Sequence, residues 1–335
     1  MKLELHPDLD SLWQVSCDAN IKTPEDVGVF LESNKEIIND GVKKGMSFYF
    51  KGFPISNSWE YENAITKLNP NFLAYTGAKV RRESELSTVL YQPTSTPGFR
   101  KNFLHNEMAY QPEIPPIITV FCEQPGNGGE TLLGDQRLVW NSIRADYREK
   151  LISKKLKFVR TLVCKSRLHD FMSKNFDFMA TFPSWQNNFN TTDKEEVRNQ
   201  LKSAGFEVSW TEKNDLVFSC VIDPFKAHPD TGEKMWVNNS HLFQLHPKVY
   251  GRFLYTMFKT YLSTSSRPMT TCLYGDGGKI EPEVISNILD ATNKNEVSIP
   301  LRKGDFIYAN NWTCGHGRKT FSGQRRLYFG LLTYR

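Results

Sequence analysis

The chain has 335 residues, of which 39% are hydrophobic and 24% charged, the composition of a globular protein. This composition excludes a collagen, a coiled coil and an intrinsically disordered chain. The 42 Lys and Arg against 37 Asp and Glu give a net charge of +5, and the basic residues are scattered along the sequence. Nucleic-acid-binding proteins concentrate such residues on one stretch or face, so no nucleic-acid partner is expected.

No stretch approaches the roughly 20 apolar residues that span a bilayer, and the acids near the start do not fit a signal peptide. The six cysteines stand far apart without a C-x-x-C pair, which is typical of reduced thiols rather than of disulfides or a zinc clip. We therefore expect a cytoplasmic protein in a reducing compartment, without a membrane partner. The sequence contains no internal repeat and no long linker, so a single domain over residues 1–335 is predicted.

The first predicted elements form an N-terminal helical flank over about residues 1–75. Thr23, followed by a proline and two acids, predicts the start of a helix over residues 24–43. The aromatic content of residues 46–51 indicates a strand, and a shorter helix is expected over residues 60–68.

The next part of the chain is rich in β-branched and aromatic residues between Pro and Gly clusters, which predicts strands at residues 87–92, 103–108 and 117–123. A helix is expected over residues 134–151, and a helical insertion over about residues 160–295. Further strands are predicted at 156–163, 207–211, 216–221, 297–301, 305–309 and 325–334, and helices at 193–203, 247–262 and 281–292. Many short strands with separate helices favour a β-sandwich or a jelly roll with helices packed outside.

Three of the seven histidines begin an H-x-[DE] tripeptide. His6 lies in a terminus that is expected to fray, and His228 lies in a Pro/Asp/Gly turn that Asp230 is expected to shape. His105 lies in a strand-like run, where residues i and i+2 share one face. His105 and Glu107 are therefore placed to hold one ion together.

A third ligand is available in His316, where Gly315 and Gly317 leave room for close backbone approach. Two histidines and one carboxylate on one face form the facial triad of non-haem Fe(II) oxygenases. Arg325 and Arg326 open the last predicted strand, and a guanidinium beside His316 suits a dicarboxylate. The residues leave two alternatives open, a zinc-dependent hydrolase on the same triad and a non-catalytic jelly-roll binding protein.

These residues belong to a longer pattern. Five elements occur in this order: His105-Asn-Glu-Met-Ala-Tyr; Gly128-Gly-Glu-Thr; His228-Pro-Asp-Thr-Gly-Glu with Met235-Trp-Val-Asn; His316-Gly-Arg; and Gln324-Arg-Arg. The pattern resembles the TauD/TfdA-type Fe(II)/2-oxoglutarate dioxygenases, most closely their clavaminate synthase-like branch, from about residue 77 to the C-terminus. This resemblance implies a mainly β protein with flanking helices (class α+β) around a double-stranded β-helix, or jelly-roll, core.

The resemblance implies that His105, Glu107 and His316 bind Fe(II) and form the catalytic centre, with 2-oxoglutarate and O₂ as cosubstrates. Halogenation is disfavoured, because family halogenases carry a small residue at the position of Glu107. Glu rather than Asp there is similar to clavaminate synthase and related amino-acid hydroxylases. The implied reaction is oxidation of a C–H bond in a small amino-acid-like substrate, with release of succinate and CO₂. Hydroxylation, desaturation and oxidative cyclisation, such as the ring closure by kainic acid synthases, all remain open.

The resemblance also implies residues for the cosubstrate. Thr131 is expected to hydrogen-bond the carboxylate near the metal, and Arg326 to pair with the distal carboxylate. Arg325 is the reserve candidate, because a one-residue slip along a strand exchanges the two faces. The family often places a second arginine four residues after the cosubstrate arginine, and here that position is Gly330. The substrate anchor must therefore differ in this chain.

Four basic residues, Arg81, Arg82, Arg100 and Lys101, precede the His-x-Glu segment. Their position allows them to face an anionic substrate. A solvent-exposed surface position is the simpler interpretation for such side chains.

Overall fold

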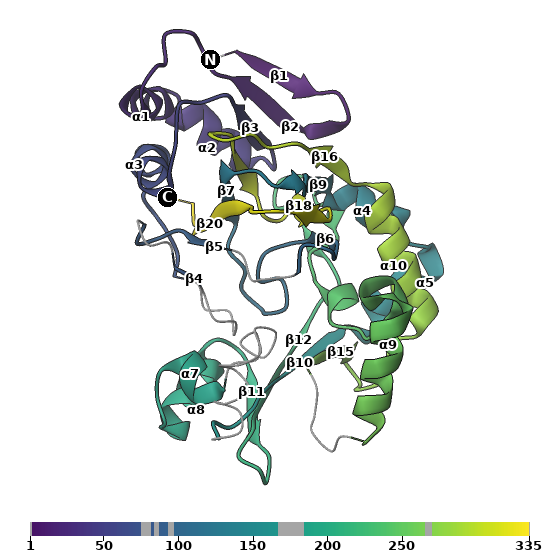
Figure 1. Cartoon of the computed structure of the whole chain (residues 1–335). Coiled ribbons are helices and arrows are strands. Elements are labelled where there is room, and N and C mark those ends of the chain that lie inside the picture. Colours follow the sequence, from purple (N-terminus) through teal and green to yellow (C-terminus); the bar gives the residue numbers. More distant parts are fainter. Residues whose placement is uncertain are drawn as a thin grey trace.

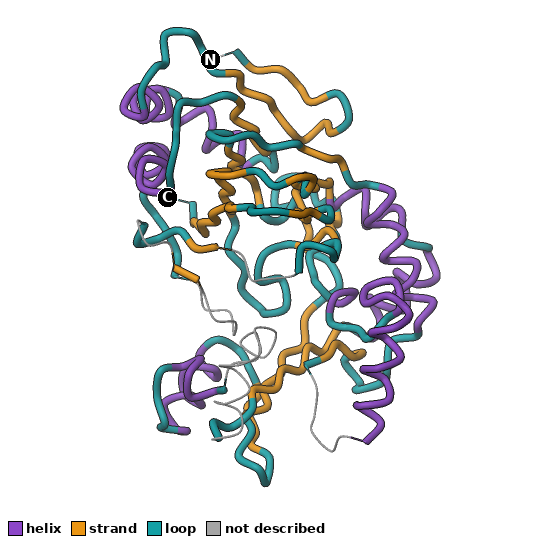
Figure 2. The backbone as a smooth tube through the Cα atoms, viewed as in Figure 1, coloured by secondary structure: helices purple, strands orange, loops and turns teal. Residues whose placement is uncertain are grey.

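The structure is a computed structural model that describes residues 2–74, 82–83, 87–92, 97–166, 184–264 and 270–334. Strands occupy the centre of the upper part, and helices lie outside them (Figures 1 and 2). The predicted mainly β fold with flanking helices and a jelly-roll core is confirmed by this arrangement. None of the described helices combines the length and the apolar composition needed to cross a membrane.

The larger sheet has eight strands, and all neighbours in it run antiparallel except β2 and β3. Its order is β1 (Leu3–His6), β2 (Leu9–Ser16), β3 (Ser47–Lys51), β17 (Phe306–Asn310), β7 (Ile117–Gln124), β20 (Arg326–Leu332), β5 (Tyr91–Gln92) and β4 (Arg82–Glu83).

A four-stranded antiparallel sheet faces it, in the order β16 (Val297–Ile299), β9 (Thr131–Asp135), β18 (Cys314–Arg318) and β6 (Asn102–His105). Apolar side chains from both sheets form one buried cluster between them, which includes Val120, Ile307, Leu327, Leu133 and Ile299. A short pair, β8 (Asn127–Gly128) with β19 (Phe321–Ser322), extends this end of the fold. The two facing sheets are the jelly-roll core, and the second of them carries the candidate site.

Three helices cover the outer face of the larger sheet: α1 (Pro24–Ser33), α2 (Lys35–Lys43) and α3 (Ser58–Leu68). Their apolar residues pack on the aromatic side chains of β3, β7 and β17. The expected capping of the first helix is confirmed, because Thr23 and Asp26 form a reciprocal capping box.

Two expectations for the N-terminal flank are wrong. The terminus around His6 does not fray, because β1 and β2 pair as a hairpin that joins the edge of the larger sheet. The single helix expected over residues 24–43 breaks at Asn34, whose φ of −112° and ψ of 8° end α1 and begin α2. The Asn34 side chain donates to the Phe30 carbonyl, a local bond that competes with helix continuation.

The helix expected over residues 134–151 is divided in the same way. Residues up to Asp135 belong to β9, and the Asp135 carboxylate then caps α4 (Gln136–Ser142) by accepting from the Arg137 backbone N–H. An extended residue, Ile143, separates α4 from α5 (Ala145–Lys154). Sheet pairing of β9 with β18 therefore overrides the helical periodicity at its start.

The region expected as a helical insertion contains a sheet as well as helices. The sheet is antiparallel in the order β11 (Glu207–Trp210), β12 (Leu216–Ile222), β10 (Leu156–Leu162) and β15 (Thr271–Tyr274). The helices are α7 (Trp185–Phe189), α8 (Lys194–Ser203), η2 (Ser240–Leu242), α9 (Pro247–Thr264) and α10 (Pro282–Lys294), and a hairpin joins β13 (Lys226–Ala227) to β14 (Lys234–Met235). Apart from the β13–β14 hairpin, these elements share one apolar cluster with α4 and α5.

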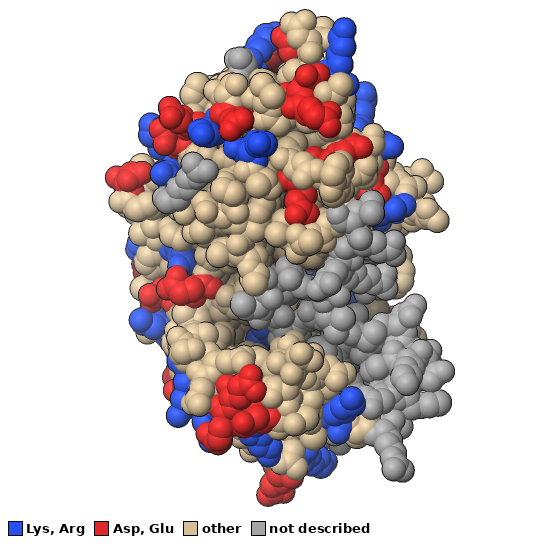
Figure 3. All heavy atoms as spheres, turned by 90° about the vertical axis from the view of Figure 1, so that its left-hand side faces the viewer, with Lys and Arg blue, Asp and Glu red and all other residues tan. Residues whose placement is uncertain are grey.

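Charged side chains on the surface are mixed in sign. On the face shown in Figure 3, basic and acidic groups are interspersed among uncharged residues. This pattern agrees with the scatter of charge along the sequence.

A buried carboxylate, Asp305, ties β17 to the end of β3. Its oxygens accept hydrogen bonds from the Gly52 N–H at 2.7 Å, the Tyr49 hydroxyl at 2.8 Å and the Arg302 N–H at 2.8 Å. We expect Asp305→Ala to lower the free energy of unfolding by about 3 kcal/mol or more, because each buried donor left without a hydrogen-bond partner costs about 1–3 kcal/mol. Urea unfolding measures this loss, with exposed Asp10→Ala as the control; a loss below about 1 kcal/mol would contradict the expectation.

Candidate metal centre

The structure brings His105, Glu107 and His316 together between the two sheets. His105 ends β6 and is the direct cross-strand partner of His316 in β18. The ring centroids of the two histidines are 4.3 Å apart, and His316 Nε2 lies 3.6 Å from Glu107 Oε2. One ligand atom from each residue lies within 4.8 Å of the other two. Such a spacing suits three ligands of one metal ion.

Glu107 reaches this position by a different route from the one that the sequence predicted. Strand β6 ends at His105, so the alternation of a strand does not place Glu107. A turn follows, and the Asn311 side chain fixes it: Oδ1 accepts from the Glu107 N–H at 2.8 Å, and Nδ2 donates to the Glu107 carbonyl at 3.0 Å. Asn311 is a positioning residue that sequence reasoning missed; the only signal was an Asn pair following a predicted strand.

The hydrogen bonds of the two histidines set which ring nitrogen faces the site. His105 Nδ1 donates to the Phe103 carbonyl at 2.9 Å, which leaves Nε2 as the ligand atom. Burial, together with the neighbouring His316, lowers the pKa of His105 to about 3, so the ring is neutral, as a metal ligand must be. Within the described residues, His316 Nδ1 is buried without a partner.

The donor set fits a facial triad. Two imidazoles and one carboxylate, the ligand set of non-haem Fe(II) oxygenases, lie close enough together to share one metal ion. Zinc enzymes also use two histidines and a glutamate, so the three ligands alone do not select the metal.

The glycines beside His316 are required by close packing. A Cβ on Gly317 would lie 2.6 Å from the Asn102 carbonyl oxygen, and one on Gly315 would overlap Gln136 Nε2. The prediction that both glycines allow close approach is confirmed.

We expect Gly317→Ala to push β18 away from β6 and to separate His316 from His105. Iron affinity should fall at least about 10-fold, and overpacking should cost about 1–3 kcal/mol of stability. Iron binding and thermal melting measure the two effects. Gly28→Ala in α1 is the control and should be neutral or stabilising, since its Cβ would make only ordinary contacts, with Lys67 Cγ at 3.6 Å and Ala64 Cα at 3.9 Å. An unchanged iron affinity in Gly317→Ala would contradict the expectation.

Thr131 lies on the same face of the sheet as His316. It begins β9 and pairs with Arg318 of β18, while its neighbour Leu133 pairs with His316. The Thr131 hydroxyl is buried and has no hydrogen-bond partner among the described residues. A buried hydroxyl without a partner costs about 1–3 kcal/mol, so this one is placed to bond a ligand.

A cavity of about 160 Å³ is lined in part by Glu130, the residue before Thr131. Arg325 lines it, and its guanidinium makes no hydrogen bond or ion pair with any residue that the structure describes. Burial, with a smaller contribution from nearby Arg318, lowers the pKa of Arg325 to about 10. The other lining residues are Cys122, Pro125, Gly126, Gly128, Gly129, Pro300, Leu301 and Leu327.

Arg326, the cosubstrate candidate that the sequence predicted first, points elsewhere. Its side chain is about half exposed and pairs with Glu123 at 2.9 Å, with a further bond to Gln124 at 3.2 Å. The arginine that faces the cavity is the reserve candidate Arg325.

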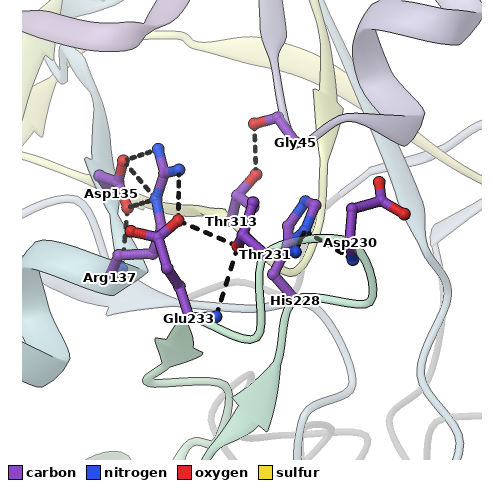
Figure 4. Close-up of polar contacts among 8 residues, drawn as sticks. All are labelled: Gly45, Asp135, Arg137, His228, Asp230, Thr231, Glu233 and Thr313. Atoms are coloured by element: carbon purple, nitrogen blue, oxygen red, sulfur yellow. Dashed lines mark hydrogen bonds and ion pairs between the residues drawn. The ribbon is translucent and has the colours of Figure 1, made fainter.

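The second H-x-D motif lies in a turn, as expected, but the His228 ring, rather than the Asp230 carboxylate, bonds the turn backbone. Figure 4 shows that His228 Nδ1 accepts the backbone N–H groups of Asp230 at 3.3 Å and Thr231 at 3.4 Å. Glu233 bonds Thr231 and pairs with Arg137, which is held by Asp135, so the turn is fixed to the start of α4. His169 lies outside the described residues.

The proposed substrate-facing basic residues are engaged or lie outside the described part. Arg100 Nη2 donates to the Val249 carbonyl at 3.3 Å, and Lys101 pairs with Glu296 at 2.7 Å. Arg81 and the side chain of Arg82 lie outside the described residues. Gly330 has no room for a side chain, because a Cβ there would lie 2.9 Å from Phe72 and 3.0 Å from Leu90.

Comparison with known proteins identifies the family. Residues 16–332 match the family model of the taurine catabolism dioxygenase TauD, TfdA family. The chain is 27% identical over 287 residues to the dapdiamide synthesis protein DdaC of Enterobacter agglomerans, covering 84% of this chain and 80% of that protein. It is 21% identical over 309 residues to a clavaminate synthase-like protein of Arabidopsis thaliana, covering 90% and 86%.

Among solved structures, asparagine oxygenase in complex with Fe(II), 2S,3S-3-hydroxyasparagine and succinate has a similar fold. The TM-score is 0.51 at 9% identity, covering 96% of this chain and 93% of the other. Since the family model spans nearly the whole chain and the His-Glu-His centre is assembled, the protein belongs to the TauD/TfdA family and is an Fe(II)/2-oxoglutarate-dependent dioxygenase.

Proposed function

We propose that this dioxygenase oxidises a C–H bond of a small amino-acid-like substrate, with release of succinate and CO₂. The observation that carries the proposal is an assembled His-Glu-His centre together with a cavity that holds an arginine without a hydrogen-bond or ion-pair partner among the described residues. Hydrolysis uses no dicarboxylate cosubstrate, so a zinc hydrolase would not require this arginine. Two proteins similar to this chain support the substrate class by their names, since one acts in dapdiamide synthesis and the other is an asparagine oxygenase.

In this proposal, His105, Glu107 and His316 hold Fe(II). When bound, Fe(II) with 2-oxoglutarate supplies the activation of O₂ that attack on an unactivated C–H bond requires. Burial keeps the His105 imidazole neutral, and Asn311 fixes Glu107. The triad is thereby preorganised before any ligand arrives.

Arg325 and Thr131 bind the two ends of 2-oxoglutarate. Arg325 offers a fork of N–H donors inside the cavity, which matches the distal carboxylate in a bidentate pair. The Thr131 hydroxyl donates to the carboxylate nearer the metal. Gly129 allows the backbone to pass close to Arg325, since a Cβ there would lie 3.1 Å from Arg325 Nε.

Apolar side chains close the site on the side of the larger sheet. The Phe329 ring lies 5.8 Å from the His316 ring, and both side chains are buried. Such a wall excludes water from the reacting centre. The position of the substrate C–H bond relative to the metal then decides among hydroxylation, desaturation and ring closure.

An anaerobic titration tests the proposed function. Metal-free protein is titrated with Fe(II) and 2-oxoglutarate, and the visible charge-transfer band of the chelate is recorded. A band that depends on both additions is expected, and Zn(II) in place of Fe(II) gives the blank. Succinate release is then measured with a panel of amino acids. Absence of the band from iron-loaded protein would refute the cosubstrate assignment.

A further inference from the structure

Arg160 is a charged residue on the inward face of the sheet formed by β10, β11, β12 and β15. Along β10 the buried positions alternate, and they are Leu156, Phe158, Arg160 and Leu162. Arg160 is 7% exposed and is the only arginine or lysine among the described side chains that is buried. Burying a guanidinium costs several kcal/mol unless an acidic group compensates it. Stability alone therefore does not explain an arginine at this position.

No acidic group of the described chain compensates Arg160. Its Nε is buried without a partner, and no hydrogen bond or ion pair links its guanidinium to another described residue. The guanidinium lies instead over two rings, 4.5 Å from the centroid of Tyr110 and 5.3 Å from that of Phe218. Contact with the rings orients the guanidinium plane. The N–H donors in that plane can then bond a planar anion. A carboxylate has the matching geometry.

Arg160 lies beside the loop that carries a metal ligand. Tyr110 follows Glu107 by three residues, so their Cα atoms are at most about 11 Å apart. In Figure 1, β10 and β12 lie below β6, the strand that presents His105. The Cys220 thiol of β12 also donates to the Tyr110 carbonyl at 3.6 Å, which joins the loop to the sheet. Tyr110 therefore connects the segment that carries Glu107 to Arg160.

The neighbouring cations do not compete for this role. Arg100 and Lys101 bond Val249 and Glu296, and Arg325 lines the separate cavity assigned to the cosubstrate. Counted from Arg325, the position four residues on, where the family often carries a second arginine, is Phe329, a buried apolar residue.

We propose that Arg160 binds the carboxylate of the substrate, which is therefore a small free acid of the amino-acid type. The proposal rests on the proposed function, because the other end of the substrate is oxidised at the triad. A bidentate pair would hold one end of the substrate, and the rings of Tyr110 and Phe218 would shield it from water. The distance between Arg160 and the triad then selects which carbon is oxidised.

Arg160→Gln tests substrate binding separately from cosubstrate binding. The protein is loaded with Zn(II) in place of Fe(II) and saturated with 2-oxoglutarate, so that the Arg325 cavity is filled. The probes are the twenty proteinogenic L-amino acids, their N-acetyl derivatives and the corresponding primary amides, in ligand-observed NMR. At least one free acid should bind, and its amide should not. Arg160→Gln should weaken the binding of that acid at least about 10-fold.

Arg144→Gln is the matched control. Arg144 also stacks on a ring, 4.4 Å from the centroid of Tyr147, but it is exposed and paired with Asp146. The Arg144→Gln protein should bind the free acid as tightly as the unchanged protein. Arg160→Gln should melt no lower than the unchanged protein, because it removes an uncompensated buried charge. Arg160→Lys keeps the charge without the fork and serves as a second variant.

The outcomes separate the two proposals. Loss of acid binding in Arg160→Gln, with the Fe(II)/2-oxoglutarate band intact, supports the role of Arg160. Undiminished binding in Arg160→Gln, or no free acid bound by the unchanged protein, overturns it. Absence of the band in the unchanged protein counts instead against the proposed function.

Discussion

Arg325→Ala weakens the binding of 2-oxoglutarate by about 100-fold, whereas Arg326→Ala changes it by less than about 3-fold. The first substitution removes a half-buried fork in the cavity, placed to make charge-assisted bonds worth about 1.5–3 kcal/mol each. The second removes a half-exposed group that already pairs with Glu123, and such surface pairs contribute at most about 1 kcal/mol. Titration of the charge-transfer band with 2-oxoglutarate gives both dissociation constants.

The two arginines are adjacent and have the same chemistry, so each variant is the control for the other. Iron content is measured in both to show that the triad is intact. The reverse order of effects would show that Arg326, the first prediction from the sequence, binds the distal carboxylate of 2-oxoglutarate. Equal, small effects would remove both arginines from the cosubstrate site.

His316→Ala should abolish stoichiometric Fe(II) binding and, with it, succinate formation. Removing even an outer partner of a metal ligand typically costs 10–100-fold in affinity, and loss of a ligand itself exceeds this. The remaining His105 and Glu107 form an incomplete triad. Iron per chain after gel filtration and the rate of succinate formation measure the two losses.

His6→Ala is the control for this substitution, because His6 lies outside the triad and its Nδ1 only accepts from the Asp8 N–H at 3.3 Å. It should keep its iron and its activity. A His316→Ala protein that retains one tightly bound iron per chain would show that the triad is not the metal site. Circular dichroism checks that both variants are folded.

The sequence could predict the metal centre because its parts carry strong local signals. His105 stands in a strand-like run and His316 stands between two glycines, and neither pattern depends on distant contacts. Glu107 was placed correctly near His105 but for the wrong reason, since a turn held by Asn311 replaces the expected strand. The contact with Asn311 joins distant parts of the chain, which local patterns do not reveal.

Local sequence patterns do not determine which of Arg325 and Arg326 faces the cavity. Both residues fit the same sequence element, and a shift of one residue reverses which of them faces inward. The register of β20 on β7 contains an irregularity between Arg326 and Leu327, and only the paired strands reveal it. The family match, rather than the triad, decided against a zinc hydrolase and a binding protein.

Secondary structure was missed where tertiary pairing overrides local preference. Strand β18 contains two glycines, which weaken an isolated strand, yet it is paired on both sides by β9 and β6. Arg160 is the opposite case, because strand alternation puts it on the apolar face although its charge indicates the surface. Exceptions of this kind are expected at functional sites.

The direct pairing of His105 with His316 makes the iron a contributor to the lifetime of the protein. The two residues are far apart in the sequence and meet only after the C-terminal strands have docked, so a nascent or unfolded chain offers no complete ligand set. A ligand that binds only the folded state raises its stability, by about 2.7 kcal/mol at a hundredfold excess over the dissociation constant. Iron limitation would therefore reduce how much of this enzyme survives proteolysis in a cell, in addition to how fast each molecule turns over.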